Sequence, residues 1–226
     1  MLQSAWRPLP RRLPRQVALP VDSSKVIGLT GVRRSGKTFL FFETMGRLLE
    51  SGVDRRRLVY LSFEDDRLQP IRADELDLVL RCHRELFPEC LGQRTYLFLD
   101  EVQNVTGWER WVRRLHDTED VGLFVTGSSS RLMTRDLASA LRGRSVTLEV
   151  FPLSFREYLG FRGLSWQPGL ADSESLVRAA LEDYLRWGGF PEVVLADEAM
   201  KPLILGEYSS LMLYRDIVAR YRVRHA

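Results

Sequence analysis

Gly31-Val-Arg-Arg-Ser-Gly-Lys-Thr38 fits the phosphate-binding loop pattern G-x-x-x-x-G-K-[ST] at every position. Its two glycines allow a tight turn in which successive backbone N–H groups point at one anion. Lys37 is predicted to reach the β- and γ-phosphates of a nucleotide, and Thr38 to offer its hydroxyl to Mg²⁺. The predicted phosphate site comprises Gly31, Arg33, Arg34, Ser35, Gly36, Lys37 and Thr38. Arg33 and Arg34 either neutralise phosphate there or lie on the protein surface.

The flanking sequence supplies the structural context that this motif requires. Residues 26–30 read as a buried strand, and residues 39–42 open an apolar helix that we expect to run to about Ser51, before Gly52. A strand, a glycine-rich loop and a helix in this order are typical of nucleotide binding, because the helix adds the positive end of its dipole. The alternative is a glycine-rich turn without a ligand.

A second signature follows at Thr95-Tyr-Leu-Phe-Leu-Asp100-Glu101, where an apolar strand ends in two carboxylates. Asp100 is predicted to hold Mg²⁺, directly or through water. Glu101 is placed to act as a general base on the water that attacks the γ-phosphate. The alternative is a strand whose exposed end happens to be acidic. A Glu directly after the Asp favours ATP hydrolysis over transfer to a small acceptor.

Two further strands are predicted to end in polar residues. Residues 58–63 lead into Glu64 and Asp65, which either sense the γ-phosphate or cap the following helix. The strand at 121–126 is followed by Gly127-Ser-Ser-Ser130, and Ser128 is predicted to lie next to the γ-phosphate.

Arginines precede the last predicted strand, which spans residues 145–150. Arg142 and Arg144 are candidates for charge stabilisers that reach the nucleotide of a neighbouring subunit. That role requires a homo-oligomer, either a dimer or a ring. The alternative is ordinary ion pairing on the surface.

Composition limits the remaining possibilities. The 226 residues are 45% hydrophobic, which is enough for one good core and a small appendage. The net charge of +3 is too small to be a strong indication of nucleic-acid binding. Cys82 and His83 are expected to form a pair on a helix surface and not a metal site. No apolar run reaches the roughly 18 residues of a membrane span, and no signal-type segment follows Met1, so we expect a cytoplasmic protein without membrane contact.

The chain divides into two predicted domains. Residues 1–162 form an α/β core, in which residues 1–20 are an irregular, Pro- and Arg-rich arm that either packs on the core or touches nucleotide or nucleic acid. A Gly- and Pro-containing stretch at 161–173 marks the boundary. Residues 163–226 have helical periodicity, which Gly188-Gly-Phe-Pro191 interrupts.

The ordered set of motifs resembles the AAA-like ATPases of bacteria and archaea, over about residues 20–222. The resemblance rests on residues 31–38, Phe63-Glu-Asp65, Leu97-Phe-Leu-Asp-Glu-Val-Gln103, Trp108-Glu-Arg-Trp111, Val125-Thr-Gly-Ser-Ser-Ser130, Leu141-Arg-Gly-Arg144 and Phe151-Pro-Leu-Ser-Phe155. It implies a P-loop αβα sandwich with a parallel five-stranded sheet in the order 5-1-4-3-2, followed by a helical lid.

The resemblance also carries roles over to individual positions. Lys37 and Thr38 then bind phosphate and Mg²⁺, Asp100 and Glu101 are the metal holder and the base, Ser128 is the first sensor, and Arg142 and Arg144 are arginine fingers. Gly188-Gly-Phe-Pro-Glu192 matches a family motif whose role the sequence does not reveal. Such ATPases usually continue into a second domain, so we expect either a truncated chain or a single-module form.

The sequence therefore predicts a slow, Mg²⁺-dependent AAA-type ATPase, in which hydrolysis to ADP and phosphate drives a conformational change between core and lid. The alternative is an ATP-dependent switch or scaffold with little turnover that contacts a protein or DNA. A small-molecule kinase is the third hypothesis, and the Asp100-Glu101 pair counts against it.

Overall fold

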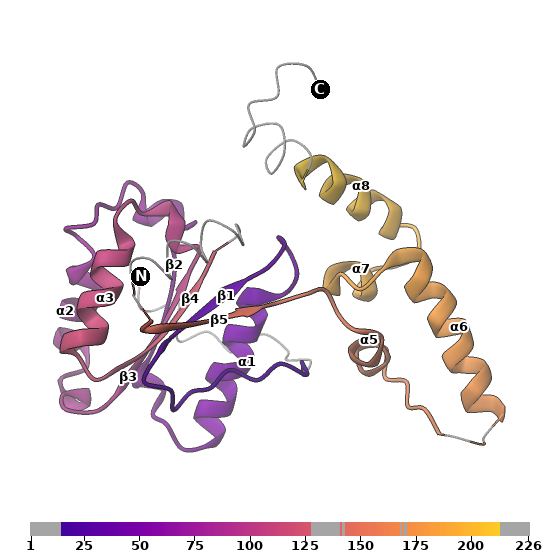
Figure 1. Ribbon diagram of the computed structural model, residues 1–226, viewed down its shortest axis with the longest axis horizontal. Helices are drawn as coiled ribbons and strands as arrows, with labels where there is room; N and C mark the ends of the chain where they lie inside the picture. The colour runs from indigo at the N-terminus through magenta and orange to yellow at the C-terminus, as the bar shows by residue number, and fades with distance from the viewer. Residues whose placement is uncertain (1–14, 128–140, 142, 168, 170, 213–226) are drawn as a thin grey trace, which may run out of the picture. The chain divides into compact units, whose positions relative to one another are not determined.

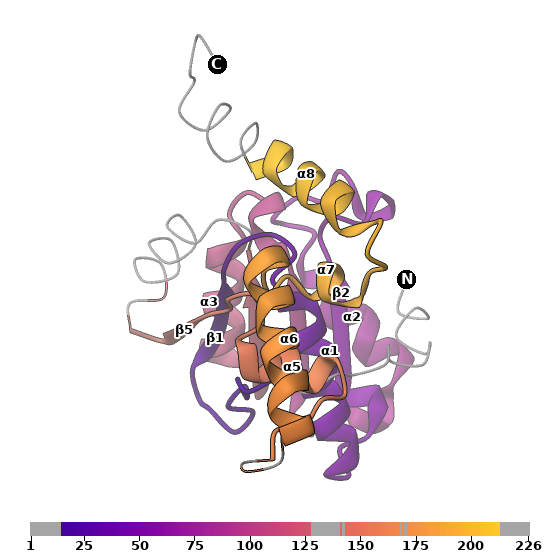
Figure 2. The ribbon, with the colours of Figure 1, turned by 90° about the vertical axis from the view of Figure 1, so that its right-hand side faces the viewer.

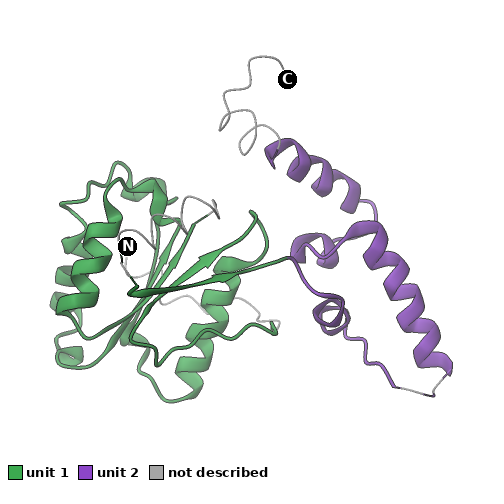
Figure 3. Cartoon of the chain, viewed as in Figure 1, with its two compact units in different colours: residues 1–151 green, residues 152–226 purple. Residues whose placement is uncertain are grey.

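The structure is a computed structural model that describes residues 15–127, 141, 143–167, 169 and 171–212. The chain forms two compact units, Met1–Phe151 and Pro152–Ala226 (Figure 3). This division comes earlier than the one expected from the Gly- and Pro-containing stretch, because the short helix α5 (Phe155–Phe161) packs with the helices that follow it.

The first unit is built on a five-stranded, all-parallel sheet in the order β2-β3-β4-β1-β5, which confirms the predicted order (Figure 1). The strands are β1 (Val26–Thr30), β2 (Leu58–Ser62), β3 (Thr95–Asp100), β4 (Val121–Thr126) and β5 (Ser145–Glu149). Because all strands run the same way, their carboxyl ends lie at one edge of the sheet. The phosphate-binding loop and Asp100 both lie at that edge.

Helices cover both faces of this sheet (Figure 1). On one face lie α2 (Asp77–Leu86) and α3 (Trp108–Thr118), and on the other lies α1 (Lys37–Glu50). Alternate residues of β3 serve the two layers, since Leu97 and Leu99 pack with α2 and α3 while Phe98 packs with α1. The result is a P-loop αβα sandwich. Single turns of 3₁₀ helix connect the elements at Arg55–Arg57, Asp66–Leu68, Pro88–Cys90 and Val102–Asn104.

The second unit is helical, with α5, α6 (Ala171–Trp187), α7 (Pro191–Leu195) and α8 (Lys201–Leu211) (Figure 2). Its small core joins Leu153 and Tyr158 to Ala180 and Val194. A reciprocal capping box starts α5, because the Ser154 hydroxyl and the Glu157 carboxylate each accept a backbone N–H of the other residue.

A buried ion pair ties the helices of this unit together. The Lys201 ammonium, at 3% exposure, donates to Asp183 of α6 at 3.1 Å and to Glu198 at 2.9 Å. Asp183 also accepts the Tyr158 hydroxyl of α5 at 2.6 Å. One carboxylate thus links three helices.

The Gly188–Glu192 motif has a structural role in the same unit. A Cβ on Gly189 would lie 2.3 Å from the Leu153 carbonyl oxygen, and the Gly189 carbonyl accepts the Leu153 N–H at 2.7 Å. Tyr184 donates its hydroxyl to that Leu153 carbonyl at 2.8 Å. The motif therefore brings the turn between α6 and α7 against the backbone of Leu153, which only glycine permits.

The expectation that Cys82 and His83 share a helix surface was wrong for His83. His83 is buried at 2% exposure, where its Nε2 lies 2.6 Å from the Arg56 carbonyl oxygen, while its neighbour Cys82 is exposed. In the apolar stretch that opens α1, Phe39 is 59% exposed. Within the described part of the chain, no helix is long and apolar enough to cross a membrane.

Candidate nucleotide-binding site

The loop between β1 and α1 takes a backbone path that constrains its sequence. Gly31 has φ of 140°, Arg34 of 62° and Gly36 of 97°. A Cβ on Gly31 would lie 2.2 Å from the Val150 carbonyl oxygen, just after β5. Glycine is required at this position by both the dihedral angle and the close approach of the backbone.

Lys37, the first residue of α1, points its ammonium back into this loop. Its Nζ donates to the carbonyl oxygens of Gly31 and Val32, each at 3.0 Å, and the residue is only 5% exposed. Burial lowers the pKa of Lys37, while the Glu101 and Asp100 carboxylates raise it. The loop thus holds a desolvated positive charge that phosphate oxygens can engage in place of the two carbonyls.

Asp100 ends β3 with a carboxylate that three hydroxyl groups bind. Thr38 of α1 donates to Oδ2 at 2.8 Å, and Tyr60 of β2 donates to the same oxygen at 2.9 Å. Thr126 of β4 donates to Oδ1. The phosphate loop and the two neighbouring strands therefore converge on one carboxylate that is 4% exposed. Burial and the nearby Asp100 carboxylate raise the pKa of Tyr60, so its hydroxyl remains a donor.

These groups fit Mg²⁺ by their chemistry. Thr38 and Asp100 offer hydroxyl and carboxylate oxygens, the ligands that Mg²⁺ takes alongside water and phosphate. Because the Thr38 hydroxyl donates its hydrogen bond to Asp100, the lone pairs of its oxygen remain available to a cation. Among the residues that the structure describes, no cluster of three or more His, Cys, Asp or Glu side chains is suited to a metal ion.

Glu101 follows in a left-handed conformation, with φ of 54° and ψ of 48°. Its backbone N–H donates to the Thr126 hydroxyl oxygen at 3.0 Å, and Gln103 donates to its carboxylate at 2.5 Å. A non-glycine residue in this region carries strain that its surroundings must compensate. Glu101, a residue of intermediate burial, directly follows β3 and lies at the same edge of the sheet as Lys37.

The acidic residues after β2 take separate roles. Asp65 caps the 3₁₀ turn Asp66–Leu68 by accepting the Arg67 N–H at 3.1 Å, and the hydrogen bonds from Arg67 hold the pKa of Asp65 at about 2. Glu64 instead forms an ion pair with Arg33 of the phosphate loop at 3.7 Å. Of the two predicted roles, Asp65 therefore has the capping one, and Glu64 is connected to the loop through Arg33.

A family model described as an AAA domain matches residues 23–159. The chain belongs to this AAA domain family. Its relatives include uncharacterized protein MJ1544 of Methanocaldococcus jannaschii, 34% identical over 93% of this chain and 46% of that protein. An uncharacterized protein of Haemophilus influenzae is 31% identical over 90% of this chain and 48% of that protein. The AAA domain chain thus spans about half the length of these relatives.

Solved structures similar to this AAA domain chain include PCH-2 of C. elegans, with a TM-score of 0.44 at 15% identity over 87% of this chain and 63% of that chain. AMPPCP-bound DnaA from Aquifex aeolicus has a TM-score of 0.37 at 15% identity over 88% of this chain and 64% of that chain. Family membership, together with the loop, supports an ATP-binding AAA-type protein.

Of the two arginine candidates, Arg144 lies apart from the loop of its own AAA domain. Arg144 directly precedes β5, whose first residue pairs with Val26 at the amino end of β1, so it lies at the opposite edge of the sheet from Lys37. Its Nε donates to Asp117 at 2.8 Å. Arg142 and Ser128 lie outside the described residues.

The sequence did not single out Tyr60, Thr126 or Arg15 as parts of this site. The Arg15 guanidinium donates to the Ser35 carbonyl of the phosphate loop at 2.9 Å and to the Phe151 carbonyl at 2.8 Å. The end of the predicted N-terminal arm is thus packed on the AAA domain core, while residues 1–14 lie outside the described part of the chain. A polar residue that ends a buried strand is the signal that points to Thr126.

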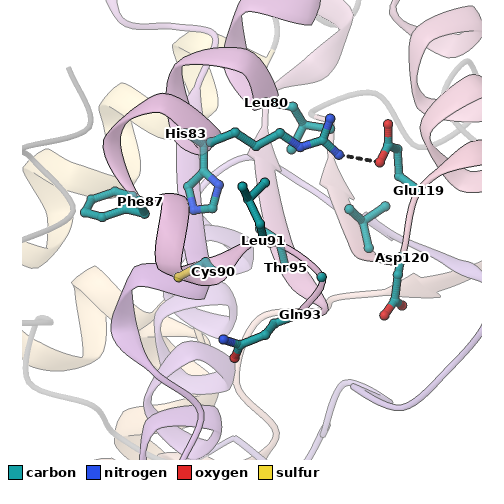
Figure 4. A pocket seen from close by; sticks show the side chains of 12 residues that line it. Leu80, His83, Phe87, Cys90, Leu91, Gln93, Thr95, Glu119 and Asp120 are labelled. Atoms are coloured by element: carbon teal, nitrogen blue, oxygen red, sulfur yellow. Dashed lines mark hydrogen bonds and ion pairs between the residues drawn. The ribbon is translucent and has the colours of Figure 1, made fainter.

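A separate pocket of about 180 Å³ lies near the amino ends of β3 and β4 (Figure 4). His83, Cys90, Thr95 and Asp120 line it, and an ion pair between Arg84 and Glu119 lies at its side. Burial raises the pKa of the Cys90 thiol, so this thiol is not activated as a nucleophile. Because it lies near the amino ends of these strands, the pocket is separate from the candidate nucleotide site at their carboxyl ends.

Proposed function

We propose that this AAA domain binds Mg²⁺-ATP at residues 31–38 and slowly hydrolyses it to ADP and phosphate. The observation that carries the proposal is the 2.8 Å hydrogen bond from Thr38 to Asp100, beside the buried Lys37 ammonium. Two motifs 62 residues apart thereby meet at one edge of the sheet. Neither motif alone would define a site for phosphate, metal and water together.

In this proposal each residue has one task. Lys37 exchanges the Gly31 and Val32 carbonyls for phosphate oxygens. Thr38 and Asp100 hold Mg²⁺, which when bound neutralises charge on the phosphate oxygens. Glu101 accepts a proton from the water that attacks the γ-phosphorus, while the bond from that phosphorus to the β–γ bridging oxygen breaks. Ser128 remains the proposed first sensor.

Hydrolysis is proposed to drive a conformational change between the α/β core and a helical lid, which was predicted over residues 163–226 and here corresponds to the unit Pro152–Ala226 that includes α5. Residues 150–153 supply a route for it. The Val150 carbonyl lies against Gly31 in the first unit, and Leu153 is bonded to Gly189 in the second. A shift of the phosphate loop would therefore act on the segment that leads into the helices.

A homo-oligomer is the setting in which Arg142 and Arg144 could act. The position of Arg144 at the far edge of its own sheet supports action on the nucleotide of a neighbouring copy. Its bond to Asp117 would hold the guanidinium in one orientation for that contact.

Phosphate release measured with Mg²⁺ and with EDTA tests the proposed function. We expect slow release that requires Mg²⁺ and falls about 100-fold in Lys37→Ala, because a charge that stabilises the transferring phosphoryl group is lost. Lys25→Ala is the matched control, since Lys25 is exposed and bonds to Gly143 just before β5. Equal rates in the two variants would show that the loop is not the site.

One observation favours the alternative of a switch with little turnover. Gln103 already occupies one oxygen of the Glu101 carboxylate, at 2.5 Å. If ATP binds and the wild-type chain releases no phosphate, the chain is a switch or scaffold. Binding of a protein or DNA partner should then differ between ATP and ADP at a stated salt concentration.

A further inference from the structure

Tyr60 lies in β2, next to the strand that ends at Asp100. The register pairs Tyr60 with Phe98 and Ser62 with Asp100, so Tyr60 is two residues behind the end of the sheet. Its ring packs on Phe42 of α1 with a centroid distance of 5.0 Å, and its hydroxyl extends to Asp100 Oδ2 at 2.9 Å. The aromatic contact fixes the ring, and the length of the side chain carries the hydroxyl to the site.

Asp100 is bound from both sides of its own strand. Tyr60 reaches one carboxylate oxygen from β2, and Thr126 reaches the other from β4. Rotation of an aspartate carboxylate about its terminal bond is otherwise soft, so donors on opposite sides restrict its orientation. Thr38 is different, because it belongs to the phosphate loop and is itself a candidate for the cation.

We propose that Tyr60 is a positioning residue that holds the Asp100 carboxylate in the orientation required for Mg²⁺ bound with the nucleotide. This inference rests on the proposed function, since it assigns a role at the same site. Partners of metal-binding carboxylates commonly change metal affinity by 10- to 100-fold when they are lost. A tyrosine that merely filled the core would have no such effect on the metal.

Tyr60→Phe separates these two roles, because it keeps the ring on Phe42 and removes only the hydroxyl. The probe is a fluorescent ADP, titrated once with Mg²⁺ and once with EDTA. The Kd in EDTA divided by the Kd in Mg²⁺ measures how much bound metal strengthens nucleotide binding. We expect this ratio to fall about 10-fold in Tyr60→Phe, while the Kd in EDTA stays within about twofold of the wild-type value.

Tyr96→Phe is the matched control. Tyr96 is a buried tyrosine of β3 that pairs with Leu58, at the opposite end of the same strands from Asp100. It should leave the ratio unchanged. Asp100→Asn provides a double-mutant cycle: adding Tyr60→Phe to it should lower the ratio no further, because Tyr60 acts through the Asp100 carboxylate. Thermal unfolding of each nucleotide-free variant verifies that it is folded.

The possible failures are distinguishable. A wild-type ratio in Tyr60→Phe would overturn the inference and leave the proposed function intact. Equal weakening with Mg²⁺ and with EDTA, or a further loss on top of Asp100→Asn, would assign Tyr60 a purely structural role and also overturn it. A wild-type chain whose ADP affinity does not respond to Mg²⁺ would overturn the metal site itself, and the role of Tyr60 with it.

Discussion

Replacing Gly31 by alanine should disrupt the phosphate loop and the end of β5 together. The new Cβ would lie 2.2 Å from the Val150 carbonyl oxygen, well inside the roughly 3.5 Å at which such atoms attract. The φ of 140° adds about 1–3 kcal/mol of strain for a residue with a side chain. Relieving the clash also weakens the 2.7 Å bond from Val150 N–H to Thr30, a further ~1 kcal/mol. We expect a loss of about 2–4 kcal/mol in unfolding free energy.

Urea unfolding and titration with a fluorescent ADP measure the two consequences. Gly52→Ala is the control, since Gly52 also has positive φ, at 89°, but a Cβ there meets nothing within 4 Å. It should cost only about 1–2 kcal/mol and leave nucleotide affinity unchanged. The reasoning is refuted if the two variants lose the same stability, or if Gly31→Ala binds ADP as tightly as the wild type.

Three further predictions concern the helical unit and the far edge of the sheet. Gly189→Ala should destabilise the chain by about 2 kcal/mol, because its Cβ would lie against the Leu153 carbonyl, whereas Gly206→Ala, in open space within α8, should stabilise it by about 0.5–1 kcal/mol. Thermal unfolding distinguishes the two variants, and similar unfolding temperatures would contradict the packing role of Gly189. Lys201→Met should cost about 2–3 kcal/mol, less than a fully buried pair, because its partner carboxylates retain exposure; an unchanged unfolding temperature would show that the ion pair contributes nothing. Arg144→Ala should lower phosphate release, and mixing it with Lys37→Ala should restore part of it if the arginine acts between copies; additive activities in the mixture would exclude that role.

Most of the strands, and the strand–loop–helix setting of residues 31–38, were predictable because their signals are local. The loop at residues 31–38 and the acidic end of β3 are motifs of neighbouring residues, and apolar runs marked β1 and β3. The family resemblance supplied the strand order, which the residues alone did not.

The supporting residues were not predictable, because their partners are distant in sequence. Tyr60 sits among apolar neighbours and reads as core until the register of β2 on β3 places it two residues behind Asp100. Thr126 is separated from Asp100 by α3, and only their adjacency in the sheet reveals the bond. His83 was expected on a surface because its neighbouring sequence does not reveal its partner. That partner is the Arg56 carbonyl, in the turn before β2.

Bound nucleotide in Glu101→Gln tests the central claim most directly. The variant keeps the size of the side chain and removes the base, so it should retain ATP affinity and lose hydrolysis. Wild type and variant are incubated with radiolabelled ATP and Mg²⁺, and the nucleotide that stays on the protein is separated. We predict ADP on the wild-type protein and intact ATP on Glu101→Gln. ADP on the variant at the wild-type rate would contradict Glu101 as the base.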